Sequence, residues 1–180
     1  ASEWPARIIG IHRGRYEDWA EEVAASRRPL TQAPAALIGP LIDTSLNVSE
    51  ARGRRLAGDP AVRYLGRWGF APSMAAAPLW PTPDVGDALR RPVPSSIPVV
   101  FLHGDWDTST PIENSRDIQP FFPNSRLIVV RRGGHGAIYD LADQNPATMD
   151  MMLDYLRTGN MAGLPSEIAL KPPKFTAPQG

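Results

Sequence analysis

The sequence predicts an α/β fold in which a series of helices precedes a short parallel β-sheet. Two apolar runs, residues 99–102 and 127–130, are rich in valine or isoleucine and bounded by turn residues, which is typical of buried strands. Between them, residues 111–122 carry apolar side chains at a spacing that fits a helix. A strand, a crossover helix and a second strand form a parallel unit.

Two chemically active side chains follow the predicted strands. Asp107 comes after the first strand and His135 after the second. Active groups in open parallel sheets gather beyond the carboxyl ends of the strands, so we expect these two side chains on adjacent loops. A hydrogen bond between them would fix the histidine tautomer and stabilise the imidazolium formed in catalysis. Standing alone, Asp107 would equally suit a turn or a helix cap.

The residues around this pair resemble a known family. Gly104, Asp107, Thr110 and Pro111 follow the pattern G-x-x-D-x-x-T-P, and G-G-H-G follows at residues 133–136. This combination resembles the last two triad elements of the α/β-hydrolase fold, so the chain looks like the C-terminal part of an α/β-hydrolase. The string HGDWDTSTP is similar to the branch that contains proline iminopeptidases and tripeptidyl aminopeptidases. The resemblance extends over residues 95–158.

In that family the triad runs nucleophile, acid, histidine along the chain. The resemblance therefore implies that Asp107 is the acid and His135 the base of a serine hydrolase. It implies no cofactor, and it favours peptides cleaved from a free N-terminus, with esters and small amides still open. Asp105 is a competing carboxylate, but the family pattern places the acid three residues before the Thr-Pro pair.

The nucleophile of such a triad is missing from the sequence. The motif G-x-S-x-G does not occur, because the glycine pairs at that spacing flank His12 and Met161, and no cysteine replaces the serine. We therefore expect the chain to be docked on the N-terminal portion of the same precursor, which would carry the serine. Two or three strands alone would leave an apolar sheet face and an unpaired strand edge.

The chain before the first strand has the character of a helical lid. Residues 15–28 show helical spacing, with acidic residues early and arginines late. Ser49 is expected to cap a helix that stops at Gly58, and Asp59-Pro60 to begin another that ends near Gly69. Residues 1–14 are open to a short helix or an extended arm. Residues 30–48 are expected to be mostly loop, with a helical turn within residues 35–42, and residues 71–96 show no convincing periodicity.

The sequence thus predicts a lid at residues 1–92, the C-terminal part of the hydrolase core at 93–160 and an extended tail at 161–180. Residues 136–144 are expected to be a loop with at most one helical turn. The final helix begins at Asn145-Pro146 and ends at a glycine, Gly159. One apolar stripe is predicted along it: Met149, Met152, Leu153 and Leu156.

Several other side chains allow a structural or a functional interpretation. Asp105 is expected to bond to backbone, His103 to be structural, and His12 to lie at the surface or in packing. Three histidines without a paired helical spacing do not predict a metal site. Trp106 either lines the pocket or packs. Lid carboxylates bind the substrate amino group in aminopeptidase relatives, which makes two residues candidates: Asp43 and Glu50.

Composition excludes several classes of protein. The 19 basic and 19 acidic side chains cancel, and no basic stripe points to nucleic acid as a partner. No apolar run approaches the length of a membrane span. The absence of cysteine rules out disulfides and thiolate metal sites. Peptidases of the resembled branch are often exported, so we expect a secreted or periplasmic location.

A second class of function is a binding or interaction protein built on a degenerate hydrolase fold. The absent nucleophile favours this class, whereas Asp107 and His135 favour the enzyme, because neither is needed for folding alone. A cofactor-binding domain is disfavoured by the lack of a glycine-rich phosphate loop. The denatured mass of the purified material distinguishes the first two, since a second polypeptide carrying a serine motif would indicate the enzyme.

Overall fold

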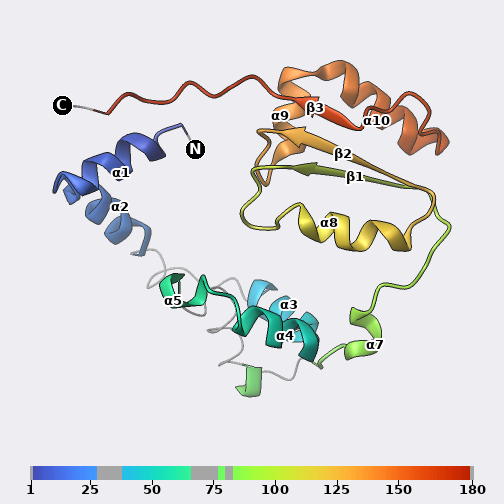
Figure 1. Ribbon diagram of the computed structural model, residues 1–180, viewed down its shortest axis with the longest axis horizontal. Helices are drawn as coiled ribbons and strands as arrows, with labels where there is room; N and C mark the ends of the chain where they lie inside the picture. Colours follow the sequence, from blue (N-terminus) through green and yellow to red (C-terminus); the bar gives the residue numbers. More distant parts are fainter. Residues whose placement is uncertain (1, 28–37, 66–76, 80–82, 179–180) are drawn as a thin grey trace. The chain divides into compact units, whose positions relative to one another are not determined.

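The computed structural model describes residues 2–27, 38–65, 77–79 and 83–178. The chain divides into two compact units. The sheet unit comprises Ala1–Gly14 with Val93–Gly180, and the helical unit comprises Arg15–Pro92. Figure 1 shows the strands and their covering helices in the first unit and short helices in the second. The molecule therefore has the α/β fold that the sequence predicts.

The sheet contains three parallel strands in the order β1-β2-β3. Val99 lies opposite Ser125, and Val129 lies opposite Glu167. β1 and β2 confirm the strands predicted from the two apolar runs. Within the described residues neither β1 nor β3 pairs with a further strand, so both are edges. The strand bounds are β1 (Val99–Gly104), β2 (Ser125–Arg131) and β3 (Glu167–Ala169).

The third strand corrects the prediction that residues 161–180 form only an extended tail. Glu167–Ala169 pairs with β2, and Ile168 is buried together with the flanking Leu164 and Leu170. The strand has three residues, of which only the middle one faces the core. A pattern this short is too brief to identify a strand, and the segment joins the sheet because its neighbours also bury apolar surface.

The crossover from β1 to β2 consists of α8 (Glu113–Ile118) and the 3-10 turn η3 (Gln119–Phe121). The predicted helix over residues 111–122 is shortened, because Pro120 lacks the N–H that a further α-helical turn would use. Phe122 packs edge-on against Phe101 of β1, with ring centres 5.8 Å apart. Side chains alternate along a strand, so the crossover contacts the sheet face that carries Phe101.

The opposite face of the sheet carries the core. It is covered by α9 (Ala137–Gln144) and α10 (Pro146–Thr158), so helices lie on both faces. Met149 and Met152 of α10 pack against this cluster. Seven buried apolar side chains form it: Ile128, Val130, Ala137, Leu141, Leu164, Ile168 and Leu170.

Helix α9 replaces the loop predicted for residues 136–144. Leu141 is fully buried, and this packing stabilises a helix that was not predicted from the local sequence. Helix α10 begins as predicted, with Asn145 Oδ1 accepting a hydrogen bond from the Thr148 N–H at 3.3 Å. It ends at Gly159, whose φ of 70° lies in the left-handed region that favours glycine.

The predicted apolar stripe of α10 is correct only for its two methionines. Leu153 and Leu156 are 44% and 73% exposed. Tyr155 takes the inner position, and its hydroxyl donates to the carbonyl oxygen of Pro98 at 2.9 Å. The inward face of this helix therefore follows residues 149, 152 and 155.

The N-terminal segment, for which the sequence left a helix and an extended arm open, forms α1 (Trp4–His12). None of its side chains is buried. The N–H of Thr176 donates to the carbonyl of Ser2 at 3.0 Å within the same unit. Residues 1–14 therefore group with the sheet unit, and the helical unit ends at Pro92.

The described part of the helical unit consists of short helices. The predicted helix over 15–28 is confirmed as α2, and Ser49 Oγ accepts from the Arg52 N–H at the start of α4, which ends at Gly58. Residues 30–48, predicted to be mostly loop, contain α3, whereas the predicted end near Gly69 lies outside the described residues. The elements are α2 (Glu17–Arg27), α3 (Ile38–Leu46), α4 (Glu50–Ala57), α5 (Val62–Leu65), η2 (Ala77–Leu79) and α7 (Asp87–Arg90).

Little of the helical unit is buried. Thr44 is the one buried residue in the part of this unit whose burial is described. Arg90 of α7 ties the unit together, with ion pairs to Asp84 and Asp87 and a hydrogen bond to the carbonyl of Leu46. Among all described helices, none has the length and apolarity needed to cross a membrane.

Candidate active site

Asp107 lies in a tight turn three residues beyond the end of β1. Its Oδ1 accepts hydrogen bonds from the N–H groups of Ser109 at 2.9 Å and Thr110 at 3.0 Å. Its Oδ2 accepts from the Thr110 hydroxyl at 2.7 Å. The residue is only 9% exposed. Asp107 can therefore be both a turn former and a site residue, because the turn positions its carboxylate.

The electrostatics of this turn favour the ionised carboxylate. Burial by itself would raise the pKa of Asp107. The hydrogen bonds from the Thr110 N–H, the Thr110 hydroxyl, His135 and the Ser109 N–H outweigh burial and hold the pKa well below its usual range. Asp107 is thus charged at neutral pH.

His135 stands in the turn between β2 and α9. Its Nδ1 lies 3.0 Å from Asp107 Oδ2 and 3.3 Å from Thr110 Oγ1. An ionised carboxylate only accepts, so His135 Nδ1 must carry the proton. The Thr110 hydroxyl gives its own proton to Asp107 and accepts from the same Nδ1–H. In the neutral imidazole, His135 Nε2 is then left with a free lone pair, and the side chain is 67% exposed.

A second histidine, His103, faces Asp107 from β1 but is engaged elsewhere. Its Nε2 lies 2.6 Å from the carbonyl oxygen of Thr110 and 3.6 Å from Asp107 Oδ2. A carbonyl only accepts, so His103 Nε2 carries the proton, and Nδ1 accepts from the Ser115 hydroxyl at 2.7 Å. Both ring nitrogens are used in the scaffold, as expected for a structural histidine.

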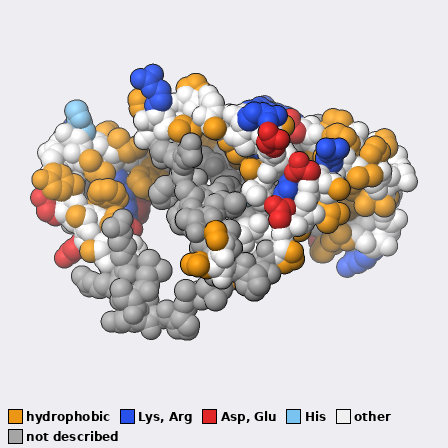
Figure 2. Space-filling model, turned by 90° about the horizontal axis from the view of Figure 1, so that it is seen from below, with side chains coloured by type: hydrophobic (Ala, Val, Ile, Leu, Met, Phe, Trp, Pro, Cys, Tyr) orange, Lys and Arg blue, Asp and Glu red, His pale blue; other side chains and the backbone are white. Residues whose placement is uncertain are grey.

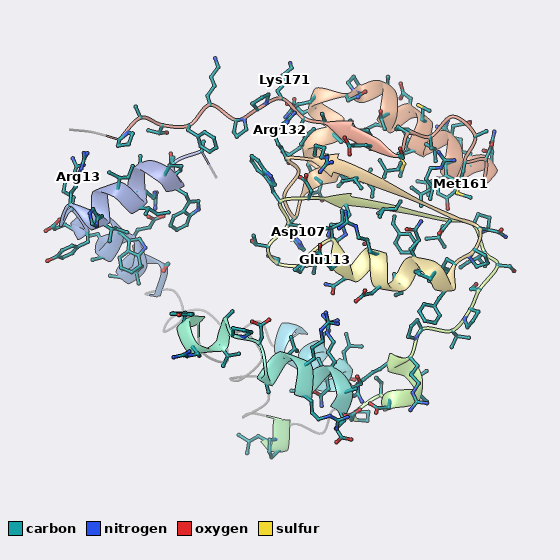
Figure 3. All side chains as sticks on the ribbon, in the orientation of Figure 1. Arg13, Asp107, Glu113, Arg132, Met161 and Lys171 are labelled. Atoms are coloured by element: carbon teal, nitrogen blue, oxygen red, sulfur yellow. The ribbon has the colours of Figure 1, made fainter. Side chains whose placement is uncertain are left out.

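The two loops approach each other closely at a pair of glycines. A Cβ atom on Gly104 would lie 2.1 Å from the carbonyl oxygen of Gly133, a separation that no side chain tolerates. The Trp106 N–H donates to that same carbonyl at 2.9 Å. Figure 3 shows Asp107 and Arg132, the residue before Gly133, near the same ends of β1 and β2. Glycine at position 104 lets the two backbones meet.

Asp105, assigned to backbone bonding from the sequence, does bond to backbone, and its partner is in the histidine loop. Its Oδ1 accepts from the Arg132 N–H at 2.6 Å, and its Oδ2 accepts from Arg131 at 3.2 Å. Sequence reasoning assigned no role to Thr110, although the T-P pattern contains it. It also missed Arg132, for which the sequence carries no local signal.

Four further side chains are candidates from the sequence. Trp106 is 45% exposed beside the acid, and His12 is exposed on α1. Glu50 lies on α4 in an ion pair with Arg54, and the side chain of Asp43 lies outside what the structure describes. In the described ranges, no group of three or more His, Asp or Glu side chains is arranged to hold a metal ion.

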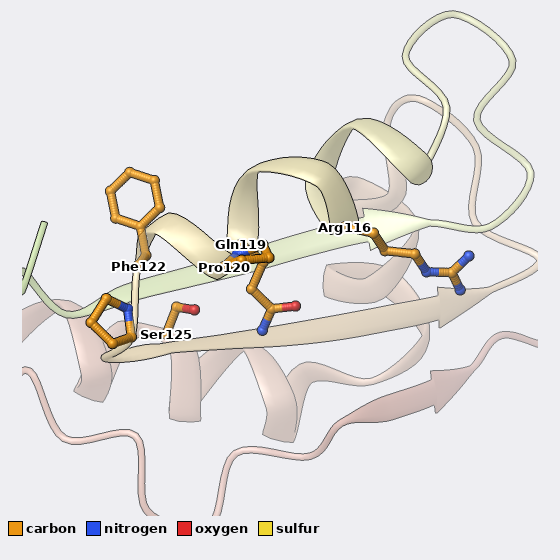
Figure 4. A pocket seen from close by; sticks show the side chains of 6 residues that line it. Arg116, Gln119, Pro120, Phe122 and Ser125 are labelled. Atoms are coloured by element: carbon orange, nitrogen blue, oxygen red, sulfur yellow. The ribbon is translucent and has the colours of Figure 1, made fainter. Parts of the chain in front are cut away.

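A shallow hollow of about 280 Å³ lies beside η3 and the start of β2 (Figure 4). Ser125 is the first residue of β2, so this hollow is at the opposite end of the strands from Asp107 and His135. It is therefore separate from the candidate catalytic pair. Its lining residues are Arg116, Gln119, Pro120, Phe122, Pro123 and Ser125.

An aspartate and a histidine that bond across the carboxyl ends of adjacent parallel strands are typical of the α/β-hydrolase class. A family model described as TAP-like protein matches residues 67–165, more than half of the 180-residue chain. The chain therefore belongs to this TAP-like family of α/β-hydrolases. No curated protein and no solved structure matches it. Family membership supports a hydrolase-type function, and the helices with their three-stranded parallel sheet fit an α/β fold consistent with the C-terminal part of an α/β-hydrolase.

Proposed function

We propose that this chain supplies the acid and the histidine of a Ser-Asp-His triad whose serine lies outside it. The observation that carries the proposal is the bond from His135 Nδ1 to the buried, ionised Asp107, which leaves Nε2 unprotonated and open to solvent. Among the described residues no serine hydroxyl bonds to His135, which supports a nucleophile supplied by another segment.

The proposed chemistry is acyl transfer through a covalent intermediate. As the serine oxygen attacks the substrate carbonyl, its proton passes to His135 Nε2. Asp107 stays ionised and stabilises the imidazolium. His135 then gives the proton to the leaving amine or alkoxide, and an acyl-enzyme remains. Water loses a proton to the same Nε2, its oxygen attacks the acyl carbon, and the serine recovers its proton.

The proposed partner is the N-terminal portion of the same precursor. The free edge of β1 and the exposed Nε2 of His135 support it, because both lack a counterpart in the described chain. In this proposal the helical unit is a lid over the site, and the chain is a processed or separated C-terminal part. A secreted or periplasmic location is proposed on the resemblance alone.

We propose peptides with a free N-terminus as substrates, with esters or small amides as the alternative. The string HGDWDTSTP and its similarity to aminopeptidases support this choice. Asp43 and Glu50 stay candidates for binding the ammonium group. An aminoacyl amide substrate and its N-acetylated counterpart test the proposal, because acetylation removes the charge and should abolish hydrolysis. Equal turnover of both would contradict it.

The experiment for the triad combines intact-mass spectrometry with a fluorophosphonate probe on the material as isolated. We expect a co-purifying polypeptide to take the label, and His135→Ala to abolish labelling. His12→Ala is the matched control, because it removes an exposed histidine of α1 and should leave labelling unchanged. If the 180-residue chain is present alone and nothing is labelled, the triad proposal is wrong. The degenerate-fold binding protein is then favoured.

A further inference from the structure

We infer that Asp105 is a positioning residue, which orients His135 by holding the main chain of the histidine loop through the N–H of Arg132. The role rests on the proposed function only in that His135 is the base; the geometry itself is independent of any nucleophile. Asp105 does not touch the reacting groups. It lies two residues before Asp107 in the acid loop. The amide that it binds, the N–H of Arg132, lies three residues before His135 in the histidine loop.

The backbone of Arg132 has an unusual conformation. Its φ of 66° lies in the left-handed region, which is unfavourable for a residue with a side chain. Such a conformation persists only where the surroundings hold it. Arg132 is one of two non-glycine residues with positive φ in the described chain, and the other, Asn47, is of a type that adopts it readily.

Arg132 is held at both ends. Its N–H donates to Asp105 Oδ1 at 2.6 Å, and its guanidinium donates through Nε to the carbonyl of Leu170 at 2.7 Å. The carboxylate of Asp105 is largely enclosed, with its side chain 20% exposed, so its bond to the amide is shielded from water. Asp105 therefore fixes the direction in which the chain leaves β2.

The bond between Asp105 and Arg132 is connected to the candidate pair. The Asp105 N–H donates to the carbonyl of Val130 at 3.1 Å, and the next residue, Trp106, donates to Gly133. Asp105 thus fastens the acid loop to the histidine loop through its own main chain and side chain together. Without the side-chain bond, the stretch from Arg132 to His135 can relax from its left-handed start, and the His135 ring loses its alignment with Asp107.

The imidazole tautomers provide a readout that does not require hydrolysis. The chain has three histidines, and the structure assigns each a different environment. His135 holds its proton on Nδ1, His103 holds it on Nε2, and His12 is exposed on α1 and serves as the unconstrained reference. Two-bond nitrogen–proton correlation spectra of histidine-labelled chain at about pH 9, above the ordinary imidazole range of about 6.5, report all three.

The test compares three variants in the labelled chain, with an unlabelled N-terminal portion present wherever it co-purifies. Asp105→Ala removes the acceptor, and we expect His135 to shift from the Nδ1–H form to the tautomer mixture of His12. Asp105→Asn keeps an acceptor oxygen for the Arg132 N–H, and Glu167→Ala removes only the other carboxylate of Arg131. We expect both to keep the wild-type His135 spectrum.

His103 reports folding in the same spectra, since its Nε2–H form requires the intact acid loop. If Asp105→Ala changes His103 as well, the variant has unfolded. Asp105→Glu then replaces it, because it keeps the charge but misplaces the oxygen, and we expect His135 alone to change. An unchanged His135 in a folded Ala or Glu variant overturns the inference. The inference is also overturned if Asp105→Asn and Glu167→Ala shift the His135 signals as much as Asp105→Ala does. The ion pairs of Arg131 would then hold the loop.

Activity gives a separate result. In the assembled hydrolase we expect Asp105→Ala to lower kcat about tenfold with KM unchanged, because ring alignment matters in the transition state and not in substrate binding. If no hydrolase activity is found, the proposed function is wrong. The tautomer spectra still test whether Asp105 positions His135. A tautomer change without any loss of kcat would overturn the positioning role in catalysis.

Discussion

At the scale of single residues, one carboxylate oxygen organises the candidate site. Asp107 Oδ2 accepts from the Thr110 hydroxyl and from His135 Nδ1, while His103 Nε2 stays 3.6 Å away on the Thr110 carbonyl. Counting donors and acceptors places a proton on the two ring nitrogens that face this oxygen, His135 Nδ1 and His103 Nε2. The two histidines thereby take opposite tautomers, and only His135 presents an unprotonated nitrogen to solvent.

Replacing Asp107 by asparagine tests the carboxylate directly. The amide is nearly the same size, but it presents no charge to the imidazolium and can offer an N–H to His135 Nδ1, which would place the histidine proton on Nε2. We expect kcat of the assembled hydrolase to fall by about 10³–10⁴-fold. Steady-state kinetics against the wild type measure the loss, and a fall of less than tenfold would mean that Asp107 is only a turn former.

The depressed pKa of Asp107 predicts an acid-dependent stability. Its folded-state pKa lies below the unfolded value of about 3.9, so its contribution is present above that value and lost as pH falls through the folded pKa. Thr110→Val removes one of the bonds to Asp107 and raises the folded pKa. We expect a loss of about 1–2 kcal/mol at pH 7 that shrinks only once the pH falls through the folded pKa of the variant, which stays well below the unfolded value of about 3.9.

Urea unfolding at pH 7 and pH 2 measures this difference. The matched control is Thr108→Val, which changes an exposed threonine of the same turn. It should shift stability little at either pH. A Thr110→Val difference that stays constant from pH 7 to pH 2 would mean that the hydroxyl stabilises the fold without acting through the Asp107 charge.

At the scale of elements, the contact between the two loops depends on glycine. Gly104→Ala would place its Cβ against the carbonyl of Gly133, and backbone cannot move aside as a side chain can. We expect a loss of about 3 kcal/mol or more, at the upper end of overpacking effects. Gly134→Ala meets nothing within 4 Å and is the control. Thermal unfolding compares them, and equal midpoints would contradict the close approach.

Strand β3 can be tested through its one inward side chain. Ile168 is 8% exposed, and Ile168→Ala should destabilise the sheet unit by about 2–4 kcal/mol. The same change at Ile138, which is 43% exposed, should have an effect of about 1 kcal/mol or less. Denaturant midpoints decide between them. Equal midpoints would show that residues 167–169 behave as the extended tail first predicted.

The difference between predicted and observed elements has a physical cause. β1, β2 and α10 could be predicted from local patterns. These are the apolar runs that begin at Val99 and Leu127 and the helix cap at Asn145. β3 and α9 depend on contacts with residues distant in sequence, such as Ile168 and Leu141 against β2. Local sequence patterns do not reveal contacts between residues that are distant in the sequence.

The same distinction applies to the candidate site. Asp107 and His135 could be predicted because short motifs surround each, and the structure brings them together. The two hydrogen bonds that fix Arg132 could not be predicted, because its partners, Asp105 and the carbonyl of Leu170, lie 27 and 38 residues away in the sequence. A backbone φ of 66° at an arginine also leaves no mark on the sequence.

At the scale of the whole molecule, apolar surface is abundant and the core is small. All eight buried apolar residues among those described lie between Ile112 and Leu170. Figure 2 shows apolar side chains over much of the described surface. Three exposed apolar side chains belong to one helix, α1: Trp4, Ile8 and Ile11, which are 53%, 60% and 38% exposed. Surfaces of this kind usually meet a partner.

We therefore expect the isolated chain to bind the dye ANS and to self-associate, because exposed apolar surface attracts both. Co-expression with the N-terminal portion of the precursor should suppress the ANS fluorescence and give a defined complex. Light scattering on the two samples is the companion measurement. A monomeric chain without ANS binding would contradict the need for a partner.

The strand order β1-β2-β3 follows the order of the sequence, and this has a consequence for synthesis of the chain. β1 can pair with β2 as soon as residue 131 has been made, so the loop that bears His135 emerges beside a nascent sheet. The second anchor of Arg132 is Leu170, which is translated 38 residues later. The histidine loop therefore gains the second anchor of Arg132 only after Leu170 has been made and has left the ribosome.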